Sequence, residues 1–84
     1  MFKYYKGRFR RALQPVFVML IDRKSKMDYA EWQNYVSYTL TRVLENPLEF
    51  LGEDMPSPSL TSDIVKEIFS EFMKEKGKRV NSLR

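Results

Sequence analysis

The helical periodicity of residues 28–46 constrains the fold of this chain more than any other feature of the sequence. Its apolar and aromatic residues recur at gaps of three and four, which fits one face of an α-helix and not the alternation of a β-strand. Asp28 can cap the first turn, because its carboxylate accepts hydrogen bonds from free backbone N–H groups. Asn46 precedes Pro47, and the residue before a proline avoids the α conformation. We therefore predict a helix over 28–45 whose apolar face is formed by Tyr29, Trp32, Val36, Leu40 and Val43.

A second helix is predicted over 60–76, where the amphipathic pattern is clearest. Ser59 or Thr61 is expected to begin this helix and Gly77 to end it. Most of its wide apolar face should belong to the core, and the remainder leaves room for a partner. The apolar residues are Ile64, Val65, Ile68, Phe69, Phe72 and Met73.

Residues 47–51 are predicted to form one short turn of helix between these two elements. Asn46 is expected to cap the turn, Pro47 to occupy its first position and Gly52 to stop it. The turn should close one end of the core.

Residues 8–24 allow two interpretations. Most of their apolar positions form a helical stripe, but the run over 16–21 also fits one buried strand, which would make 2–21 a basic hairpin. Pro15 would either kink a helix or mark the first position of a second helical segment. We predict a helix over about 8–24 that is kinked at Pro15. Because this helix is apolar nearly all round, we expect a partner chain or self-association to cover it.

The sequence as a whole predicts a small all-α bundle of three main helices in a single domain over 1–84. The domain has a basic N-terminal segment over 1–11 and a basic C-terminal tail over 77–84. A chain of 84 residues can build one modest core but not a scaffold with a buried active-site cavity. It contains no histidine and no cysteine, which removes the commonest general base and thiolate metal ligands. We expect no enzymatic activity, no cofactor, no metal and no small-molecule substrate.

The longest apolar stretch is too short to span a bilayer, and no cleavage site for a secretory signal follows it. We therefore expect no transmembrane segment and a cytoplasmic location.

Charge is distributed unevenly along the chain. Residues 1–26 hold eight cations and one acid, residues 27–73 hold two cations and nine acids, and residues 74–84 hold five cations and one acid. Two interpretations follow: the basic ends bind a polyanion, or they fold back on the acidic middle.

The first eleven residues alternate aromatic with cationic side chains. Aromatic faces can stack on bases while cations neutralise phosphates, so this segment suits single-stranded nucleic acid, with Tyr4, Tyr5 or Phe9 stacking. The same composition suits the headgroup region of a membrane. In the alternative, Phe2, Tyr5 and Phe9 join the core and the cations stay in solvent. The cations of the nucleic-acid hypothesis are Lys3, Lys6, Arg8, Arg10, Arg11, Lys78 and Arg79.

The preferred hypothesis is a helical interaction module that docks on a protein partner or forms a homo-oligomer, as a regulator or inhibitor of a larger macromolecular machine. Tyr35 and Tyr38 point away from the predicted core face, and tyrosine is enriched where proteins meet. In the alternative, which a three-helix domain favours, another helix of the same chain covers them. The acidic middle of the chain also opposes wrapping by a polyanion. The candidate interface residues are Tyr35, Tyr38, Arg42, Phe69, Phe72 and Met73.

Overall fold

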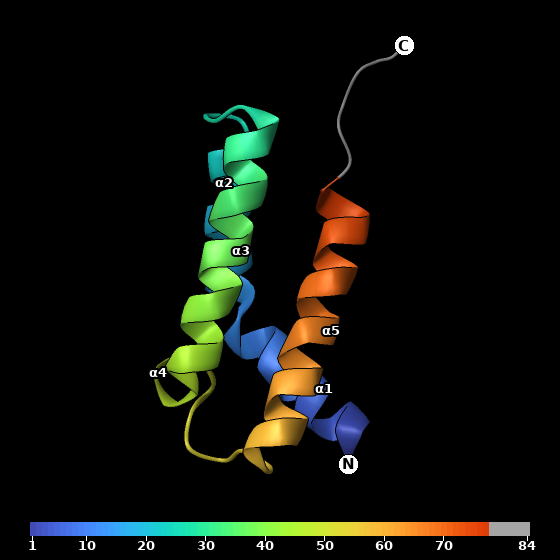
Figure 1. Ribbon diagram of the computed structural model, residues 1–84. Helices are drawn as coiled ribbons and strands as arrows, with labels where there is room; N and C mark the ends of the chain where they lie inside the picture. The colour runs from blue at the N-terminus through green and yellow to red at the C-terminus, as the bar shows by residue number, and fades with distance from the viewer. Residues whose placement is uncertain (78–84) are drawn as a thin grey trace.

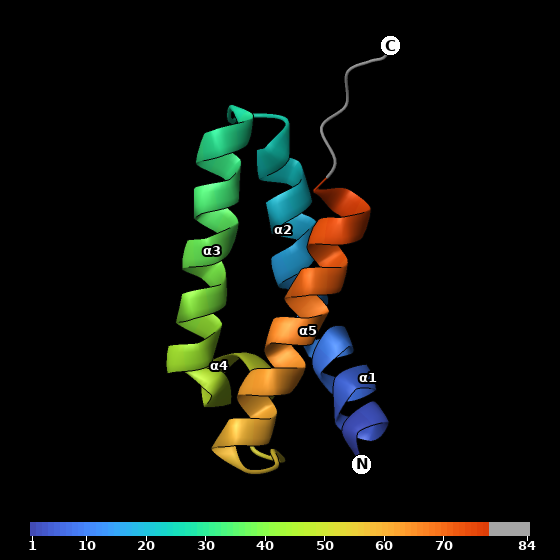
Figure 2. The same cartoon turned by 45° about the vertical axis from the view of Figure 1, so that its right-hand side comes forward.

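The computed structural model describes residues 1–77 and confirms the small all-α bundle (Figure 1). In both views α2, α3 and α5 run along the long axis, while α1 crosses beside the first half of α5 (Figure 2). The bundle is elongated, with extents of 43 × 21 × 19 Å. The helices within the described residues are α1 (Phe2–Ala12), α2 (Gln14–Lys24), α3 (Tyr29–Glu45), α4 (Pro47–Leu51) and α5 (Pro58–Lys76).

The N-terminal part is two helices rather than the single kinked helix that the pattern predicted. Helix begins at Phe2, earlier than expected, and is interrupted at Leu13. Pro15 lies in the first turn of α2, where its missing N–H costs little because the first N–H groups of a helix have no intrahelical partner. α1 therefore turns away from α2 instead of continuing it (Figure 1). No strand occurs within residues 1–77, which removes the hairpin interpretation of 2–21.

α3 begins at the predicted residue and in the predicted way. The Asp28 carboxylate accepts from the Glu31 backbone N–H at 2.9 Å, and the Glu31 carboxylate accepts from the Asp28 N–H at 3.2 Å. This reciprocal pair is a capping box, which satisfies two backbone donors that the helix leaves free. Asn46 ends α3, and its side-chain N–H donates to the Arg42 carbonyl; contrary to the prediction, its side chain makes no capping hydrogen bond to α4.

α5 begins earlier than predicted, because its cap is Ser57, two residues before Ser59 and four before Thr61. The Ser57 hydroxyl accepts from the Leu60 N–H at 3.3 Å, and Pro58 follows at the first helical position. A serine cap followed by proline is a strong helix start, because proline's fixed φ already suits the first turn. Gly52 ends α4 at a φ of +89°, a conformation that glycine tolerates best.

Trp32, near the start of α3, is the largest fully buried side chain of the core. Its indole N–H donates to the Leu20 carbonyl at 2.7 Å and so joins α3 to α2. Phe17 stacks on Phe72 with ring centroids 4.6 Å apart, which joins α2 to α5. Phe9 brings α1 into the same cluster, and Phe2 and Tyr5 pack against it. The interpretation that these aromatic residues join the core is confirmed for Phe9, while Phe2 and Tyr5 are half-buried against it. Its other part, that the cations stay in solvent, is wrong for Lys6, Arg8 and Arg10, which form ion pairs.

Candidate protein-interaction site

The cations of α1 point largely at acids elsewhere in the chain. Lys6 Nζ donates to Glu67 at 2.6 Å and also to Glu71, which in turn accepts from Arg10. On the neighbouring side of the helix, Arg8 donates to the Asp54 carboxylate at 2.9 Å. The charge pattern allowed two interpretations, binding of a polyanion by the basic ends or folding of these ends onto the acidic middle. In the structure, the basic N-terminal segment folds back onto the acidic middle.

Lys6 occupies the centre of this ionic cluster, with 19% of its side chain exposed. Hydrogen bonds to Glu67 and then Glu71 raise the pKa of the Lys6 ammonium above its usual value. The hydrogen bond from Lys6 also lowers the pKa of the Glu71 carboxyl. Each shift in pKa favours the charged form of its group, Lys6 or Glu71.

Two α1 cations remain available to a polyanion. Lys3 and Arg11 are exposed, and neither makes an ion pair within residues 1–77. Lys78 and Arg79 lie outside the described residues. Of the proposed stacking residues, Tyr4 is exposed, whereas Phe9 is fully buried and Tyr5 packs against it. The nucleic-acid hypothesis stays a prediction, but three of its cations already have intramolecular partners.

The predicted tyrosine face lines a groove of about 370 Å³ between α2 and α3, with α4 at its lower end. Tyr38 is 56% exposed and stacks on Tyr35, with ring centroids 6.4 Å apart. The Tyr35 hydroxyl reaches the Met19 sulfur at 3.8 Å, which ties the ring to α2. We call this the tyrosine groove, and its main lining residues are Val16, Met19, Tyr35, Tyr38, Arg42 and Phe50.

Two arginine side chains contact or line the tyrosine groove. The Arg23 guanidinium lies over the Tyr35 ring, 5.1 Å from its centroid, which is the geometry of a cation–π contact. Arg42 lines the groove itself and makes no ion pair with any residue of 1–77. Tyr35, Tyr38 and Arg42 are thus brought together as the sequence predicted.

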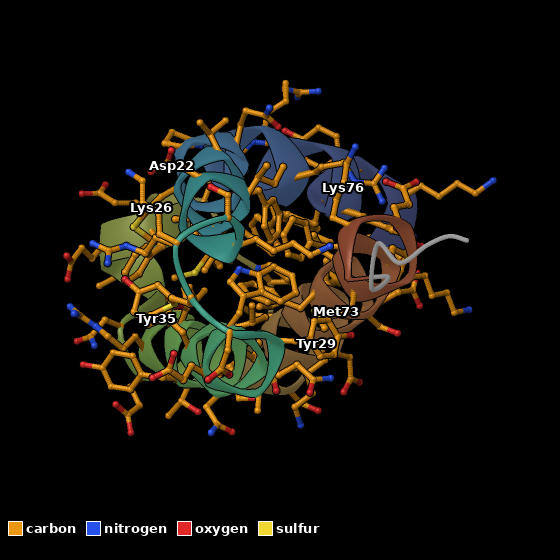
Figure 3. All side chains as sticks on the ribbon, turned by 90° about the horizontal axis from the view of Figure 1, so that it is seen from above. Asp22, Lys26, Tyr29, Tyr35, Met73 and Lys76 are labelled. Atoms are coloured by element: carbon orange, nitrogen blue, oxygen red, sulfur yellow. The ribbon has the colours of Figure 1, made fainter. Side chains whose placement is uncertain are left out.

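The other three predicted interface residues lie elsewhere. Phe69 and Phe72 are only 3% and 7% exposed and belong to the core. Met73 is half-buried and lines a separate groove between α3 and α5. Figure 3 shows Tyr35 on the α2–α3 side of the bundle and Met73 on the α3–α5 side. The wide apolar face of α5 is largely covered within the chain, because α1, α2 and α3 all pack against it.

A second surface on α2 was not among the predicted site residues. Val18 and Ile21 are 55% and 44% exposed and border a groove of about 380 Å³ between α2 and α5. The sequence does carry a signal for them, since both fall outside the helical stripe that Phe17 and Leu20 follow into the core. We call this groove the aliphatic trough, and its apolar lining is Phe17, Val18, Ile21, Ile68 and Phe72.

Comparison of the chain with protein-family models, with curated proteins and with solved structures finds no match. Among the helices of residues 1–77, none has both the length and the apolar character required to cross a membrane. The two grooves that flank α2 are the candidate interaction sites of the chain.

Proposed function

We propose that this chain is a small, non-enzymatic helical interaction module that docks on a protein partner through the tyrosine groove. Its expected role is that of a regulator or inhibitor of a larger macromolecular machine. A chain of this size has little surface to spare, so a defined groove with aromatic edges is the natural place for contact.

The observation that carries the proposal is the exposure of Tyr38 at 56% on the edge of a groove with an apolar floor. Tyrosine adds large contact area with only two side-chain torsions to immobilise, and its hydroxyl offers a hydrogen bond. Stacking on Tyr35 already restricts the ring, so less rotational freedom is lost when a partner binds.

The lining of the groove suits a partner side chain that is apolar with a polar tip. Val16, Met19 and Phe50 are half-buried and supply an apolar floor. Arg42, which makes no ion pair within residues 1–77, supplies a guanidinium at the rim that can donate to a partner's carboxylate or backbone carbonyl. Tyrosine and arginine are the residue types most enriched among energetically dominant interface positions.

The proposal is tested by photo-crosslinking from the groove. A photoreactive phenylalanine analogue placed at Tyr38 should capture one defined protein from the source cell. The same analogue at Tyr4 is the matched control, since Tyr4 is 58% exposed and also beside another tyrosine. The captured protein is then purified and titrated against the unmodified chain.

Tyr38→Ala and Arg42→Ala should each weaken that purified complex by at least about tenfold, with the fold unchanged by circular dichroism. Tyr4→Ala should leave the affinity unchanged. Equal capture from Tyr4 and Tyr38, or full affinity in the Tyr38→Ala variant, would contradict the proposal.

A further inference from the structure

We propose that the aliphatic trough is a self-association surface, on which α2 of a second copy of this chain packs antiparallel to α2 of the first. This inference concerns residues other than those of the tyrosine groove, so its test is independent of the test of the proposed function.

The exposed face of α2 is an apolar patch with polar ends. Gln14, Val18, Ile21 and Ser25 follow one another at gaps of four, three and four, which keeps them on one stripe of the helix. This spacing is that of a coiled-coil seam. Gln14 begins the helix, Ser25 is its C-terminal cap in a helical conformation, and both are exposed.

The stripe has the same spacing when it is read in either direction. In an antiparallel pair centred between Val18 and Ile21, each Val18 lies opposite the Ile21 of the other copy and each Gln14 lies opposite a Ser25. Apolar residues then meet apolar ones, and polar residues meet polar ones. That self-complementarity is what a two-fold interface requires, because both copies present the same surface.

Charge favours the antiparallel direction over the parallel one. α2 ends in Lys24, and a parallel pair would bring the Lys24 ammonium groups of both copies to the same end; Arg23 lies on the tyrosine-groove side of the helix and takes no part. The antiparallel pair separates them to opposite ends. The rim of the trough itself carries both signs, so two copies do not meet as like-charged surfaces; its charged residues are Arg10, Glu71, Lys74, Glu75 and Lys76.

Polar contacts frame the trough at both ends and leave its middle apolar. Lys24 donates to the Lys76 carbonyl at 2.6 Å near the C-terminal end of α5, and Arg10 pairs with Glu71 further down. Between them Phe17 stacks on Phe72 and forms a rigid floor beside the exposed Val18 and Ile21. Such a patch is small, so the dimer is expected to be weak and concentration-dependent.

The register is tested by disulfide trapping, which is clean because the chain contains no cysteine. Gln14→Cys and Ser25→Cys variants are prepared separately, mixed in equal amounts and oxidised under non-denaturing conditions. A disulfide requires the two Cα atoms to be about 4.4–6.8 Å apart. Because eleven residues separate positions 14 and 25, about 16 Å of helix, an antiparallel dimer brings 14 of one copy near 25 of the other.

The expected result is a mixed disulfide between the two variants that exceeds either homodisulfide by at least about fivefold. Sedimentation equilibrium of the unmodified chain up to about 1 mM should show a monomer–dimer equilibrium. Replacing Val18 and Ile21 together by Gln should weaken it by more than about tenfold. Tyr38→Ala, on the other groove, should leave it unchanged.

The inference is overturned by a monomer at every concentration, by the yields of random pairing, in which the mixed disulfide is only twice each homodisulfide, or by a dominant homodisulfide of either variant, which indicates a parallel pair. A dimer that Tyr38→Ala disrupts and the Val18 and Ile21 replacement does not would assign self-association to the tyrosine groove and would equally overturn it.

Discussion

α1 and α2 are consecutive helices of eleven residues each, and they differ in how completely the rest of the chain covers them. α1 is the more conspicuous in sequence, with its alternation of cations and aromatic rings, yet most of its distinctive side chains find partners inside the molecule. α2 looks like an ordinary core segment, yet Val18 and Ile21 remain exposed. A conspicuous composition is therefore a poor guide to which surface is left over for a partner.

The difference follows from the neighbours of each helix. α1 lies against α5, whose polar face carries Glu67 and Glu71 and therefore offers ionic partners as well as apolar contact. α2 has α3 on one side and reaches α5 through the rings of Phe17 and Phe72. Two neighbours cannot enclose a helix that is apolar nearly all round, so part of it faces solvent.

The largest expected contrast between the two helices is in core stability. Phe9→Ala, in α1, should lower the free energy of unfolding by about 3–5 kcal/mol, because it removes a fully buried ring and leaves a cavity. Val18→Ala, in α2, should change it by less than about 1 kcal/mol, because most of the side chain is exposed. Urea unfolding followed by Trp32 fluorescence measures both, since the indole is buried in the folded chain.

If Phe9→Ala proves too unstable to fold, Phe9→Leu replaces it, with an expected cost below about 1.5 kcal/mol. Equal losses for Phe9→Ala and Val18→Ala would show that α1 is a peripheral arm and would remove the contrast between the helices.

A smaller loss of stability is expected to distinguish the α1 cations that form ion pairs within residues 1–77 from those that do not. Lys6→Met leaves Glu67 and Glu71 without the ammonium that lies between them, so the two carboxylates repel each other. We expect a lower urea midpoint, and a larger loss at low salt than at high salt because ions screen the repulsion. Arg11→Met removes an exposed cation that has no ion pair within residues 1–77 and should leave the midpoint unchanged. An equal decrease of the urea midpoint in both variants would show that the stability depends on net charge and not on the ionic cluster.

The cluster also predicts how stability depends on pH. The folded-state pKa of Glu71 is lowered from 4.5, so its contribution is present above pH 4.5 and is lost as pH falls through the folded value. The folded-state pKa of Lys6 is raised from 10.5, so its contribution is present below pH 10.5 and is lost as pH rises through the folded value. Stability from this pair should therefore be level between about pH 5 and pH 10 and decline outside that range.

Urea midpoints across the pH range measure this profile. The Lys6→Met variant is its control, because it should show a shallower decline in acid. An acid decline of the same steepness in both chains would assign the loss to other carboxylates.

Local features such as α3, most of α5 and the cap of α3 could be predicted from the sequence, whereas the contacts between distant segments could not. Hydrophobic periodicity located α3 and most of α5, and Asp28 could be recognised as a cap because capping depends on residues three apart. The contacts of Lys6 with Glu67 and Glu71 cross 61 and 65 residues, so no local rule could find them. The uneven charge distribution only indicated that the basic ends either contact the acidic middle or bind a polyanion.

The candidate site also has one part that local pattern predicts and another that depends on contacts between helices. The exposure of Tyr38 followed from its place opposite the apolar stripe of its own helix. The burial of Phe69 and Phe72 depends on how many helices pack against α5, and the width of an apolar face does not report that number. Val18 and Ile21 were marked only by failing to fit the stripe of their helix, and the structure was needed to show that nothing within residues 1–77 covers them fully.

The smallest expected effect tests the uncovered side of α2 without any cross-link. If two copies associate through the aliphatic trough, association stabilises the folded chain by mass action, and the thermal midpoint rises with protein concentration. Between about 10 µM and 500 µM we expect a rise of about 1–4 °C by circular dichroism, modest because the contact is small. Replacing Val18 and Ile21 together by Gln should flatten this dependence while leaving the low-concentration midpoint nearly unchanged, since both side chains are largely exposed in the single chain. A thermal midpoint that is independent of concentration in the unmodified chain would contradict self-association. The exposed face of α2 would then remain in solvent without binding a second copy.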